Sequence, residues 1–347
     1  MKRSHDFSAR AFIALVLALC LLPALAMPFL PPARASANEI LSPTPALLDA
    51  QGRVNPKVLN ECSDYLADHF GFRQHMIGLW SRLHSLFQSS PNEQVLAGRE
   101  GWLFYSPTLT DYTGGHLSDE ALRAVARRLL DLQNRAEDRG GDFLFVIAPN
   151  KNSLYASYMP AWISDKHEDC SARRLLPLLE EYGVHYVDLF SLELPYYRTD
   201  THWTPEGAAM AADAILGRWD RKRSYAELPF VRDGLHRGDL YEMLYPAGPG
   251  AEPELRAQTV WSYECLADPK GGDAITIRTE NPEGWGSLYC WRDSFGVALY
   301  PFLAQDFASA TFTRKTSYEL PEEDFDVYLL EIVERNIPNL LEEGETS

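Results

Sequence analysis

The sequence predicts an α/β protein with a mostly parallel sheet that helices cover on both faces. Short, continuous apolar stretches such as 142–148 and 325–333 are typical of buried strands. An amphipathic helical pattern such as that of 118–139 lies between successive stretches. Residues that favour helix starts, and glycines that favour helix ends, mark the boundaries of the predicted helices between these strands. Strands that alternate with helices in this way pack as a parallel sheet between two helical layers.

The elements before the predicted sheet are mainly helical. Residues 59–87 have helical apolar spacing that is interrupted around Gly71, which predicts two helical pieces. Two apolar arms separated by glycines at 95–105 predict a hairpin. Residues 118–139 form one amphipathic pattern that ends at Gly140.

The elements of the sheet and its helices follow from 142 onward. Thr204 and Pro205 are an N-cap and a first-turn proline, so a helix begins there, and Gly183 closes the helix before it. The sequence predicts strands at 142–148, 184–190, 287–291, 309–313 and 325–333, and helices at 171–182, 204–219 and 295–305.

Composition divides the chain into three parts, the last of which contains a loop-rich stretch. Residues 1–37 combine early basic residues, an apolar run and small residues at Ala35 and Ala37, which predicts a signal peptide or signal anchor and export. Residues 38–58 are rich in proline, serine and alanine and are expected to be a spacer. The domain is expected at 59–347, with the loop-rich stretch 221–286 as an insertion or lid.

The charge balance argues against nucleic acid as a partner. Residues 1–37 hold four basic residues and one acid, so the remainder carries 28 basic and 48 acidic side chains, a net charge of −20. Phosphate binding needs a basic face, and the longest run of lysine and arginine in the sequence is three residues, at 221–223.

The cysteines predict disulfides rather than zinc. Cys20 lies in the leader, so four cysteines remain in the part of the chain that is expected to be exported to an oxidising compartment. One or two disulfides are therefore expected, and the sequence does not specify which cysteines pair. No C-x-x-C spacing points to zinc. The four are Cys62, Cys170, Cys265 and Cys290.

Three polar stretches are placed at predicted strand ends, where α/β sheets bind ligands. They are 149–152, the "TDTHW" stretch 199–203, and "WRDSFG" at 291–296. A serine needs a nearby base to act as a nucleophile, and the base needs a partner that fixes its tautomer. Ser294, His202 and Asp200 supply these three groups, with the amides after Ser294 available for an oxyanion.

Structural interpretations of the same residues remain open at this point. "DSFG" is also a common helix cap, and "DTH" is also compatible with an Asx turn that leads into the Thr204 cap. Lys151 is either a solvated loop residue or part of a site. "HRGDL" at 236–240 is expected to be a turn.

Eight motifs in order resemble one known family. They are "FGFRQ" (70–74), "GREGWLFY" (98–105), "DYTGG" (111–115), "IAPNKNSLYASYMP" (147–160), "YYRTDTHWTPEGA" (196–208), "RGDL" (237–240), "RDSFG" (292–296) and "YLLEIVERNI" (328–337). The chain resembles the periplasmic alginate O-acetyltransferases and their relatives with an SGNH-hydrolase-like domain, also called DHHW proteins. The resemblance implies a flavodoxin-like three-layer α/β/α fold with a circularly permuted motif order.

The resemblance also implies site residues. It puts the family's acid at Asp200, its base at His202 and its nucleophile at Ser294. Tyr300 and Lys151 match positions that are expected in or near the site. Arg292 stands where relatives have glycine, so a bulky cation precedes the nucleophile.

The function that the resemblance implies is O-acetylation of an exported, alginate-like polysaccharide in the periplasm through an acetyl-serine. No cofactor or metal is expected, because a membrane-bound O-acyltransferase partner would pass the acetyl group outward. Two alternatives stay open: a carbohydrate acetylesterase of SGNH type, and a non-catalytic glycan-binding member of an export complex. Membrane contact is expected only through the N-terminal segment, if it is uncleaved.

Overall fold

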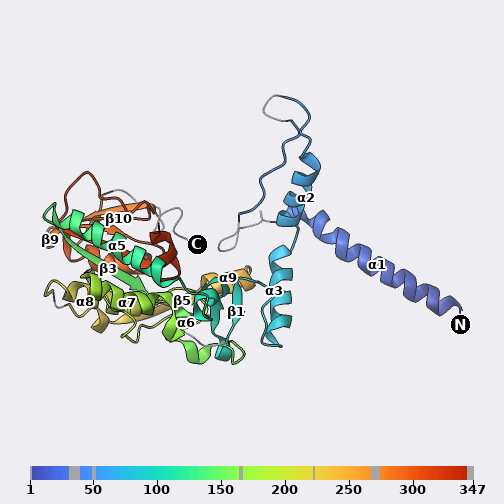
Figure 1. Ribbon diagram of the computed structural model, residues 1–347. Coiled ribbons are helices and arrows are strands. Elements are labelled where there is room, and N and C mark those ends of the chain that lie inside the picture. The colour runs from blue at the N-terminus through green and yellow to red at the C-terminus, as the bar shows by residue number, and fades with distance from the viewer. Residues whose placement is uncertain are drawn as a thin grey trace. The chain divides into compact units, whose positions relative to one another are not determined.

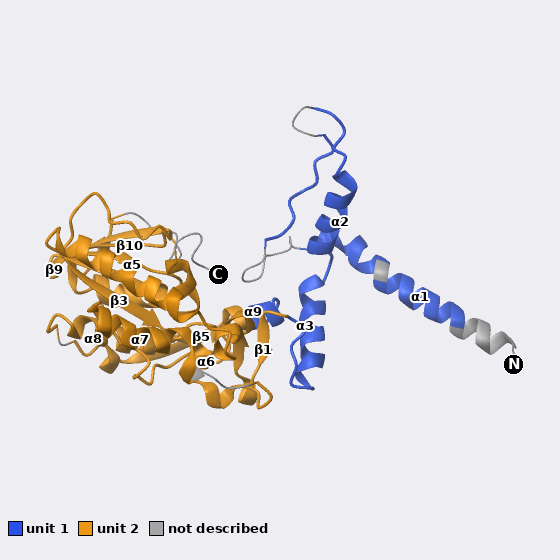
Figure 2. Ribbon diagram, in the orientation of Figure 1, with its two compact units in different colours: residues 1–92, 241–248 blue, residues 93–240, 249–347 orange. Residues whose placement is uncertain are grey.

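The structure is a computed structural model, and it describes residues 2–30, 40–48, 52–163, 167–221, 223–266 and 274–341. The chain forms two compact units, which Figure 2 colours separately. Unit 1 comprises Met1–Asn92 and Tyr241–Gly248, and unit 2 comprises Glu93–Leu240 and Pro249–Ser347. Residues 59–92, which the sequence groups with the main domain, therefore belong to unit 1.

Unit 1 is built from helices. Helix α1 is followed by a short 3-10 turn, and its stretch Ala9–Phe29 is long and apolar enough to cross a membrane. The two helical pieces expected around Gly71 are present as α2 and α3. The predicted spacer is described only at 40–48 and 52–58. The bounds are α1 (Lys2–Ala26), η1 (Met27–Phe29), α2 (Val58–His69) and α3 (Arg73–Ser85).

The main sheet lies in unit 2 and is mostly parallel (Figure 1). Among the described residues its strand order is β4-β3-β11-β9-β10-β8-β7. The first five strands pair in parallel, and β8 and β7 add an antiparallel edge. The bounds are β3 (Asp142–Ala148), β4 (Tyr186–Val187), β7 (Glu264–Cys265), β8 (Thr276–Glu280), β9 (Trp285–Trp291), β10 (Phe307–Thr313) and β11 (Val327–Val333).

Helices cover both faces of this sheet, which gives three layers. Alternate residues of β3 face opposite ways: Phe143 and Phe145 join the core with α5 and α7, whereas Leu144 and Val146 join the core with α8 and α10. The helix bounds are α5 (Asp119–Glu137), α7 (Ser171–Tyr182), α8 (Pro205–Gly217) and α10 (Gly296–Ala304). The predicted α/β fold is confirmed.

The sequence signals for helix ends act as expected. The Ser118 hydroxyl accepts a hydrogen bond from Ala121 N at 3.2 Å, and Thr204 Oγ1 accepts one from Gly207 N at 3.2 Å. Gly183 ends α7 with a φ of 74°, a left-handed conformation that favours glycine.

Smaller elements join these parts. The predicted hairpin is present as β1 and β2, which pair antiparallel, and β5 and β6 form a second two-stranded sheet. The remaining bounds are β1 (Val95–Ala97), η2 (Arg99–Gly101), β2 (Leu103–Tyr105), η3 (Ser106–Thr108), α4 (Leu109–Tyr112), α6 (Lys151–Leu154), η4 (Ala156–Tyr158), η5 (His167–Asp169), η6 (Tyr225–Glu227), β5 (Phe230–His236), α9 (Asp239–Leu244), β6 (Glu252–Ala257) and η7 (Glu334–Leu340).

Two expectations about the elements need correction. The strand expected at 184–190 pairs only at Tyr186–Val187, because β4 is an edge strand with a single parallel neighbour. The stretch 221–286, which the sequence predicts to be a loop-rich insertion or lid, contains the regular elements β5, α9, β6, β7 and β8 among its described residues. Its β8 pairs with β10 and so belongs to the main sheet.

The expected disulfides are not seen in the described part of the chain, where Cys62, Cys170, Cys265 and Cys290 are all unbridged. Cys170 and Cys290 belong to the two cores on opposite faces of the sheet. Cys265 is on β7, three strands from Cys290 on β9, which is roughly 14 Å at the usual strand spacing. A disulfide needs Cα atoms within about 7 Å. The remaining cysteine, Cys62, lies in unit 1.

Candidate active site

The turn that carries Asp200 and His202 is a closed loop rather than the end of a strand. Tyr196 and Trp203 form an isolated antiparallel bridge, and Thr204 N donates to the carbonyl of Pro195 at 2.9 Å. The buried indole of Trp203 donates to the carbonyl of Phe295 at 3.1 Å. The loop is therefore tied to the segment that carries Ser294.

Ser294 lies between the end of β9 and the start of α10. Asp293 shapes this turn: its Oδ1 accepts from Phe295 N at 2.9 Å and its Oδ2 accepts from Val333 N at 2.7 Å. Asp293 Oδ2 also accepts from Asn336 Nδ2 at 2.9 Å. The aspartate of "DSFG" thus fastens the serine turn to the end of β11 and does not cap α10.

Asp200, His202 and Ser294 form one continuous chain of contacts. His202 Nδ1 lies 2.6 Å from Asp200 Oδ1, and His202 Nε2 lies 2.9 Å from Ser294 Oγ. Asp200 Oδ1 also accepts from His202 N at 2.9 Å. The Asx turn and the carboxylate–imidazole pair are therefore the same structure, and one carboxylate oxygen serves both.

A second histidine binds the other oxygen of Asp200. His236 Nε2 lies 2.8 Å from Asp200 Oδ2, and His236 Nδ1 lies 2.7 Å from Glu254 Oε2. Tyr197 stacks on the His236 ring with the centroids 3.8 Å apart. The charged and polar groups form a row in the order Glu254, His236, Asp200, His202 and Ser294.

This row shifts the pKa values of its members. Burial alone lowers the pKa of His236, but hydrogen bonds to Asp200 and Glu254 outweigh it and raise that pKa to about 9. Burial also lowers the pKa of His202, yet Asp200 raises it above its usual value. Burial raises the pKa of Asp200, whereas hydrogen bonds to His202 and His236 hold it well below normal. Asp200 is thus ionised and His236 is a cation at neutral pH.

Sequence reasoning missed His236, Glu254 and Asp239. Asp239 Oδ1 accepts from Thr201 N at 2.8 Å and its Oδ2 accepts from Thr201 Oγ1 at 2.5 Å. Asp239 belongs to "HRGDL", a motif in which turn formation was the expected role. Gly238 is required there, because a Cβ would collide with the carbonyl of Thr199. The motif therefore holds the loop that carries Asp200 and His202.

Lys151 also contacts the loop that carries Asp200 and His202. Its buried ammonium donates to the carbonyls of Tyr197 and Arg198 at 3.1 Å each and to the carbonyl of Asp200. Three carbonyls use the three donors of an ammonium. Burial lowers the pKa of Lys151 to about 8, although the charges of Asp200, Asp239 and Glu252 oppose this shift.

Arg292 and Tyr300 contact other parts of unit 2. The buried guanidinium of Arg292 donates to the carbonyls of Asp293 at 3.2 Å and Ala274 at 2.9 Å, and its aliphatic part packs under Gly296. Tyr300 lies against Tyr263 and Phe312. The structure therefore brings Lys151 to the loop of the triad and directs Arg292 and Tyr300 to other contacts.

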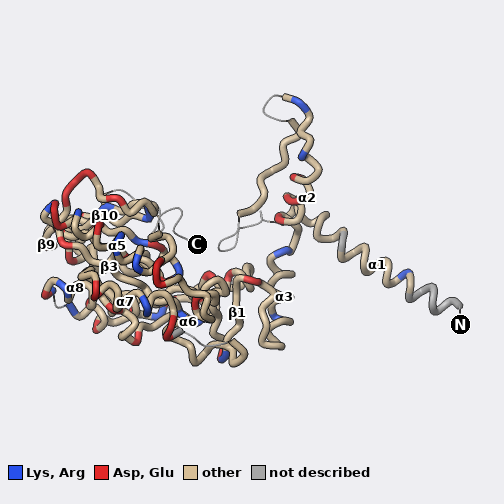
Figure 3. Tube along the Cα trace, in the orientation of Figure 1, with Lys and Arg blue, Asp and Glu red and all other residues tan. Residues whose placement is uncertain are grey.

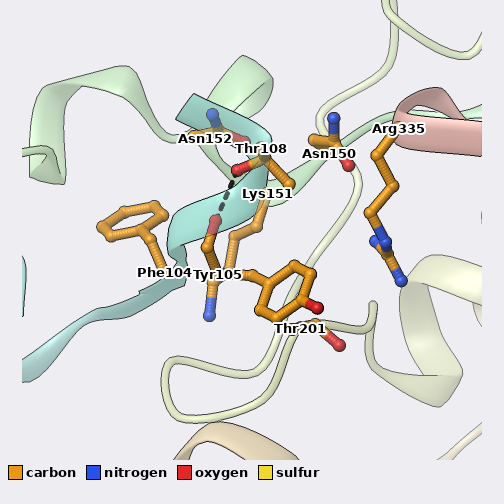
Figure 4. Close-up of a pocket in the computed structure, with 8 residues that line it drawn as sticks. All are labelled: Phe104, Tyr105, Thr108, Asn150, Lys151, Asn152, Thr201 and Arg335. Carbon is orange, nitrogen blue, oxygen red and sulfur yellow. Dashed lines mark hydrogen bonds between the residues drawn. The ribbon is translucent and has the colours of Figure 1, made fainter. Parts of the chain in front are cut away.

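A small pocket opens beside the triad loop (Figure 4). Arg335 and Tyr105 lie on two sides of it, with the guanidinium carbon 5.6 Å from the centre of the tyrosine ring. The charge of Arg335 opposes protonation of His202, so this cation is close to the base. The pocket is lined by Phe104, Tyr105, Thr108, Asn150, Lys151, Asn152, Thr201 and Arg335.

Three groups of carboxylates with histidine or cysteine lie close enough to suggest a metal site among the described residues. The group of Asp200, His202 and Asp239 is already joined by the hydrogen bonds of the triad. The second group consists of Asp111, Cys170 and Glu334. Both of its carboxylates accept hydrogen bonds from serine hydroxyls, as in the bond from Ser153 Oγ to Glu334 Oε2 at 2.7 Å. The third group is Glu137, Asp142 and His185, in which His185 Nδ1 lies 3.3 Å from Asp142 Oδ1.

Comparison with known proteins identifies similar chains. Residues 95–277, just over half of the chain, match the family described as "SGNH hydrolase-like domain, acetyltransferase AlgX". The probable alginate O-acetylase AlgJ of Pseudomonas fluorescens is 24% identical over 241 residues, which are 62% of this chain and 58% of that protein. AlgJ of Pseudomonas aeruginosa is 27% identical over 213 residues, 55% of this chain and 51% of that protein.

Solved structures share the fold. PatB1 of Bacillus cereus matches with a TM-score of 0.55 and 16% identity, over 70% of this chain and 96% of PatB1. A DHHW family protein from Eubacterium siraeum matches with a TM-score of 0.52 and 16% identity, over 73% of this chain and 97% of the other. The chain spans between half and two thirds of the length of the curated relatives that it matches.

Proposed function

Because this chain belongs to the SGNH hydrolase-like domain family of acetyltransferase AlgX, we propose that it is an O-acetyltransferase that acts on an exported polysaccharide. The observation that carries the proposal is the chain of contacts from Asp200 through His202 to Ser294, with separations of 2.6 and 2.9 Å. These are the distances that a nucleophile, its base and an orienting carboxylate require. Curated relatives named as probable alginate O-acetylases support the choice of reaction.

In the first half-reaction, the Ser294 hydroxyl gives its proton to His202 Nε2 while Oγ attacks the carbonyl carbon of an acetyl ester. The tetrahedral intermediate then collapses, the ester bond breaks, and the leaving alcohol takes the proton from Nε2. Asp200 stabilises the imidazolium between these steps. The product is acetyl-Ser294.

In the second half-reaction, a sugar hydroxyl gives its proton to His202 Nε2 and its oxygen attacks the acetyl carbon. Ser294 then leaves with that proton, and the acetylated sugar departs. As proposed, neither half uses a metal or a cofactor. The acetyl donor is a membrane-bound O-acyltransferase partner that delivers acetyl groups across the membrane.

The oxyanion donors come from the serine turn. Phe295 N and Val297 N already donate, to Asp293 Oδ1 at 2.9 Å and to the carbonyl of Ser294 at 3.2 Å. We therefore assign the role to the amides of Ser294 and Gly296, the other amides of this turn. In this arrangement, the acid and base precede the nucleophile in the chain, which is the permuted order expected for this kind of site.

The pocket beside the triad has a basic side chain that suits an acceptor sugar with carboxylates. The chain has a net charge of −17, which repels a polyuronate at long range. Two cations line the pocket beside the triad: the ammonium of Lys151 is bound to loop carbonyls, and Arg335 is held over the rings of Tyr105 and Phe295. We propose that it contacts a carboxylate or hydroxyl of the sugar next to the one that is acetylated.

A transfer assay tests the proposal. The purified chain receives a chromogenic acetyl ester with and without oligomannuronate, and both chromophore release and acetylated sugar are measured. We expect the sugar to take a large share of the acetyl groups and to speed up turnover. Fast release to water that is unaffected by the sugar would instead indicate an acetylesterase, and no release would favour a glycan-binding protein.

A further inference from the structure

Helix α3 presents its large apolar side chains to solvent. The exposed fraction is 51% for Met76, 61% for Leu79, 56% for Trp80 and 47% for Leu83. Spacings of three, four and seven residues put these side chains on one face of a helix. The four side chains span an arc of about 100° at 3.6 residues per turn, and Phe72, Leu86 and Phe87, which flank the helix, are also exposed.

The opposite face of α3 is the one that unit 1 covers. Ser81 is only 2% exposed, and a Cβ on Gly78 would lie 3.9 Å from the ring of Tyr245. The helix therefore packs with its small residues and leaves its large apolar residues outside, the reverse of a helix in a soluble core. Within unit 1, no described residue covers the apolar face.

The charge of this segment differs from that of the whole chain. Residues 69–92 contain no aspartate or glutamate, although the chain has 49 acidic and 32 basic residues. Arg73 and Arg82 lie on α3, where Figure 3 shows basic positions and no acidic one. Basic residues on the two flanks of an apolar face with an exposed tryptophan suit a surface of anionic phospholipid.

The segment is also continuous with the candidate membrane span. A Cβ at Gly71, in the turn between α2 and α3, would collide with the carbonyl of Pro23 at the end of α1. Basic residues precede the span, which directs its N-terminus to the cytoplasm and its other end to the exported side. Helix α3 thus begins beside the end of α1 that meets the outer surface of the bilayer.

We propose that α3 lies in the surface of the membrane that α1 enters. The face formed by Met76, Leu79 and Leu83 is buried at the boundary of headgroups and acyl chains. Arg73 and Arg82 lie at the level of the phosphates. This second membrane contact fixes the exported part near the bilayer, where a membrane-bound donor is available, and it does not depend on the proposed catalytic residues.

Spin labels on the full-length chain in vesicles test this proposal. Leu79→Cys carries the label on the apolar face and Ser85→Cys, exposed on the other side of the helix, is the matched control. Met76→Cys is a second apolar position in case the first variant folds poorly. Cys20, Cys62 and Cys265 are replaced by serine in each case. Vesicles consist of phosphatidylcholine alone or mixed with phosphatidylglycerol.

We expect oxygen, which partitions into lipid, to relax the labels at 79 and 76 more strongly than a water-soluble nickel complex does, with the reverse at 85. Addition of phosphatidylglycerol to the vesicles should increase the depth of the labels at 79 and 76 in the bilayer. The double variant Arg73→Gln, Arg82→Gln should not show this increase in depth. Labels at 79 and 76 that are accessible to nickel would overturn the proposal. Labels shielded from both reagents would also overturn it, because a protein would then cover the face.

Discussion

At the scale of single residues, His236 adds a positive charge to the far side of the triad. Its pKa of about 9 makes it a cation at neutral pH, and it faces the carboxylates of Asp200 and Glu254. A cation next to Asp200 weakens the pull of that carboxylate on the His202 proton. In the proposed mechanism His202 must be neutral to accept the serine proton, so we expect activity to fall as the pH drops through the pKa of His202.

We predict that His236→Gln moves the acid limb of the kcat/KM profile to higher pH. Glutamine keeps a hydrogen-bond donor to Asp200 but removes the charge, so the pKa of His202 rises further. The measurement is the pH dependence of kcat/KM with a chromogenic acetyl ester. The control His185→Gln changes a histidine that pairs with Asp142 and Glu137 and should leave the limb in place. An unmoved or lowered limb would contradict the prediction.

Glu331 is a second residue whose charge is decided by burial. It is fully buried on β11, and burial first, then the charge of Asp293, raises its pKa well above normal. The folded chain therefore favours the protonated carboxyl more than the unfolded chain does. Stability from this residue is complete below its unfolded pKa of about 4.3 and declines as the pH rises from there.

We predict that Glu331→Gln is more stable than the parent at pH 7 and nearly equal to it at pH 4. Glutamine resembles a protonated glutamate in shape and cannot ionise in the unfolded chain. Thermal unfolding at several pH values measures this difference. The exposed Glu280→Gln on β8 should have little effect at either pH. Destabilisation by Glu331→Gln that grows with pH would mean that the buried carboxyl is ionised.

At the scale of elements, the loop from Tyr196 to Trp203 depends on groups from elsewhere in the chain. Lys151 from α6 binds three of its carbonyls, and Glu252 from β6 accepts from Thr199 N at 2.8 Å. The loop also has hydrogen bonds of its own, such as that from Tyr197 N to the carbonyl of His202 at 3.3 Å, which close it across the Tyr196–Trp203 bridge. Lys151, β6 and the "HRGDL" turn add the contacts that hold the closed loop in place.

We predict that Lys151→Met lowers kcat by roughly 100-fold with little change in KM, since misplacing a catalytic group by about 1 Å has that effect. The buried carbonyls also lose their donor, which should lower the free energy of unfolding by about 1–3 kcal/mol. Steady-state kinetics and thermal unfolding measure the two effects, with the exposed Lys315→Met as the control. A large rise in KM with kcat unchanged would instead mean that Lys151 binds substrate.

How far the sequence predicts each element depends on whether the signal is local. The strand 142–148, the helix 171–182 with Gly183 and the Thr204 cap are specified by adjacent residues, and the structure has them at the expected positions. The strand at 184–190 is mostly unpaired, because pairing depends on a neighbour that the local pattern does not reveal. The strands within 221–286 were missed for the same reason.

The same distinction applies to the site. The Asp-x-His pair is local and can be read from the sequence, and a serine between a strand and a helix is a recognisable signal. His236 and Glu254 come from β5 and β6, and only the folded arrangement brings them to Asp200. Arg292 also depends on the fold, because Gly296 provides the space that lets its side chain turn inward.

At the scale of the whole molecule, charge controls how a polymeric acceptor approaches. The chain has 49 acidic and 32 basic residues and a net charge of −17. Such a molecule repels a polyanion over a Debye length of about 8 Å at physiological salt. A neutral polysaccharide experiences no comparable force.

We predict that added salt raises kcat/KM for oligomannuronate and leaves kcat/KM for a neutral oligosaccharide unchanged. Screening removes the long-range repulsion and leaves the short contact with Arg335 largely intact. Initial rates at several sodium chloride concentrations measure this effect. A kcat/KM for oligomannuronate that falls with salt would mean that attraction by local cations dominates the approach.

The central claim, that Ser294 carries the acetyl group with His202 as its base, is tested most directly by intact-mass and peptide mass spectrometry after brief exposure to an acetyl ester. We predict a mass gain of one acetyl group, located on Ser294, that is absent in Ser294→Ala and strongly reduced in His202→Ala. The acetyl group should disappear when an oligosaccharide acceptor is added. Equal acetylation of the parent chain and Ser294→Ala, or acetylation of Ser294 that does not need His202, would contradict the claim.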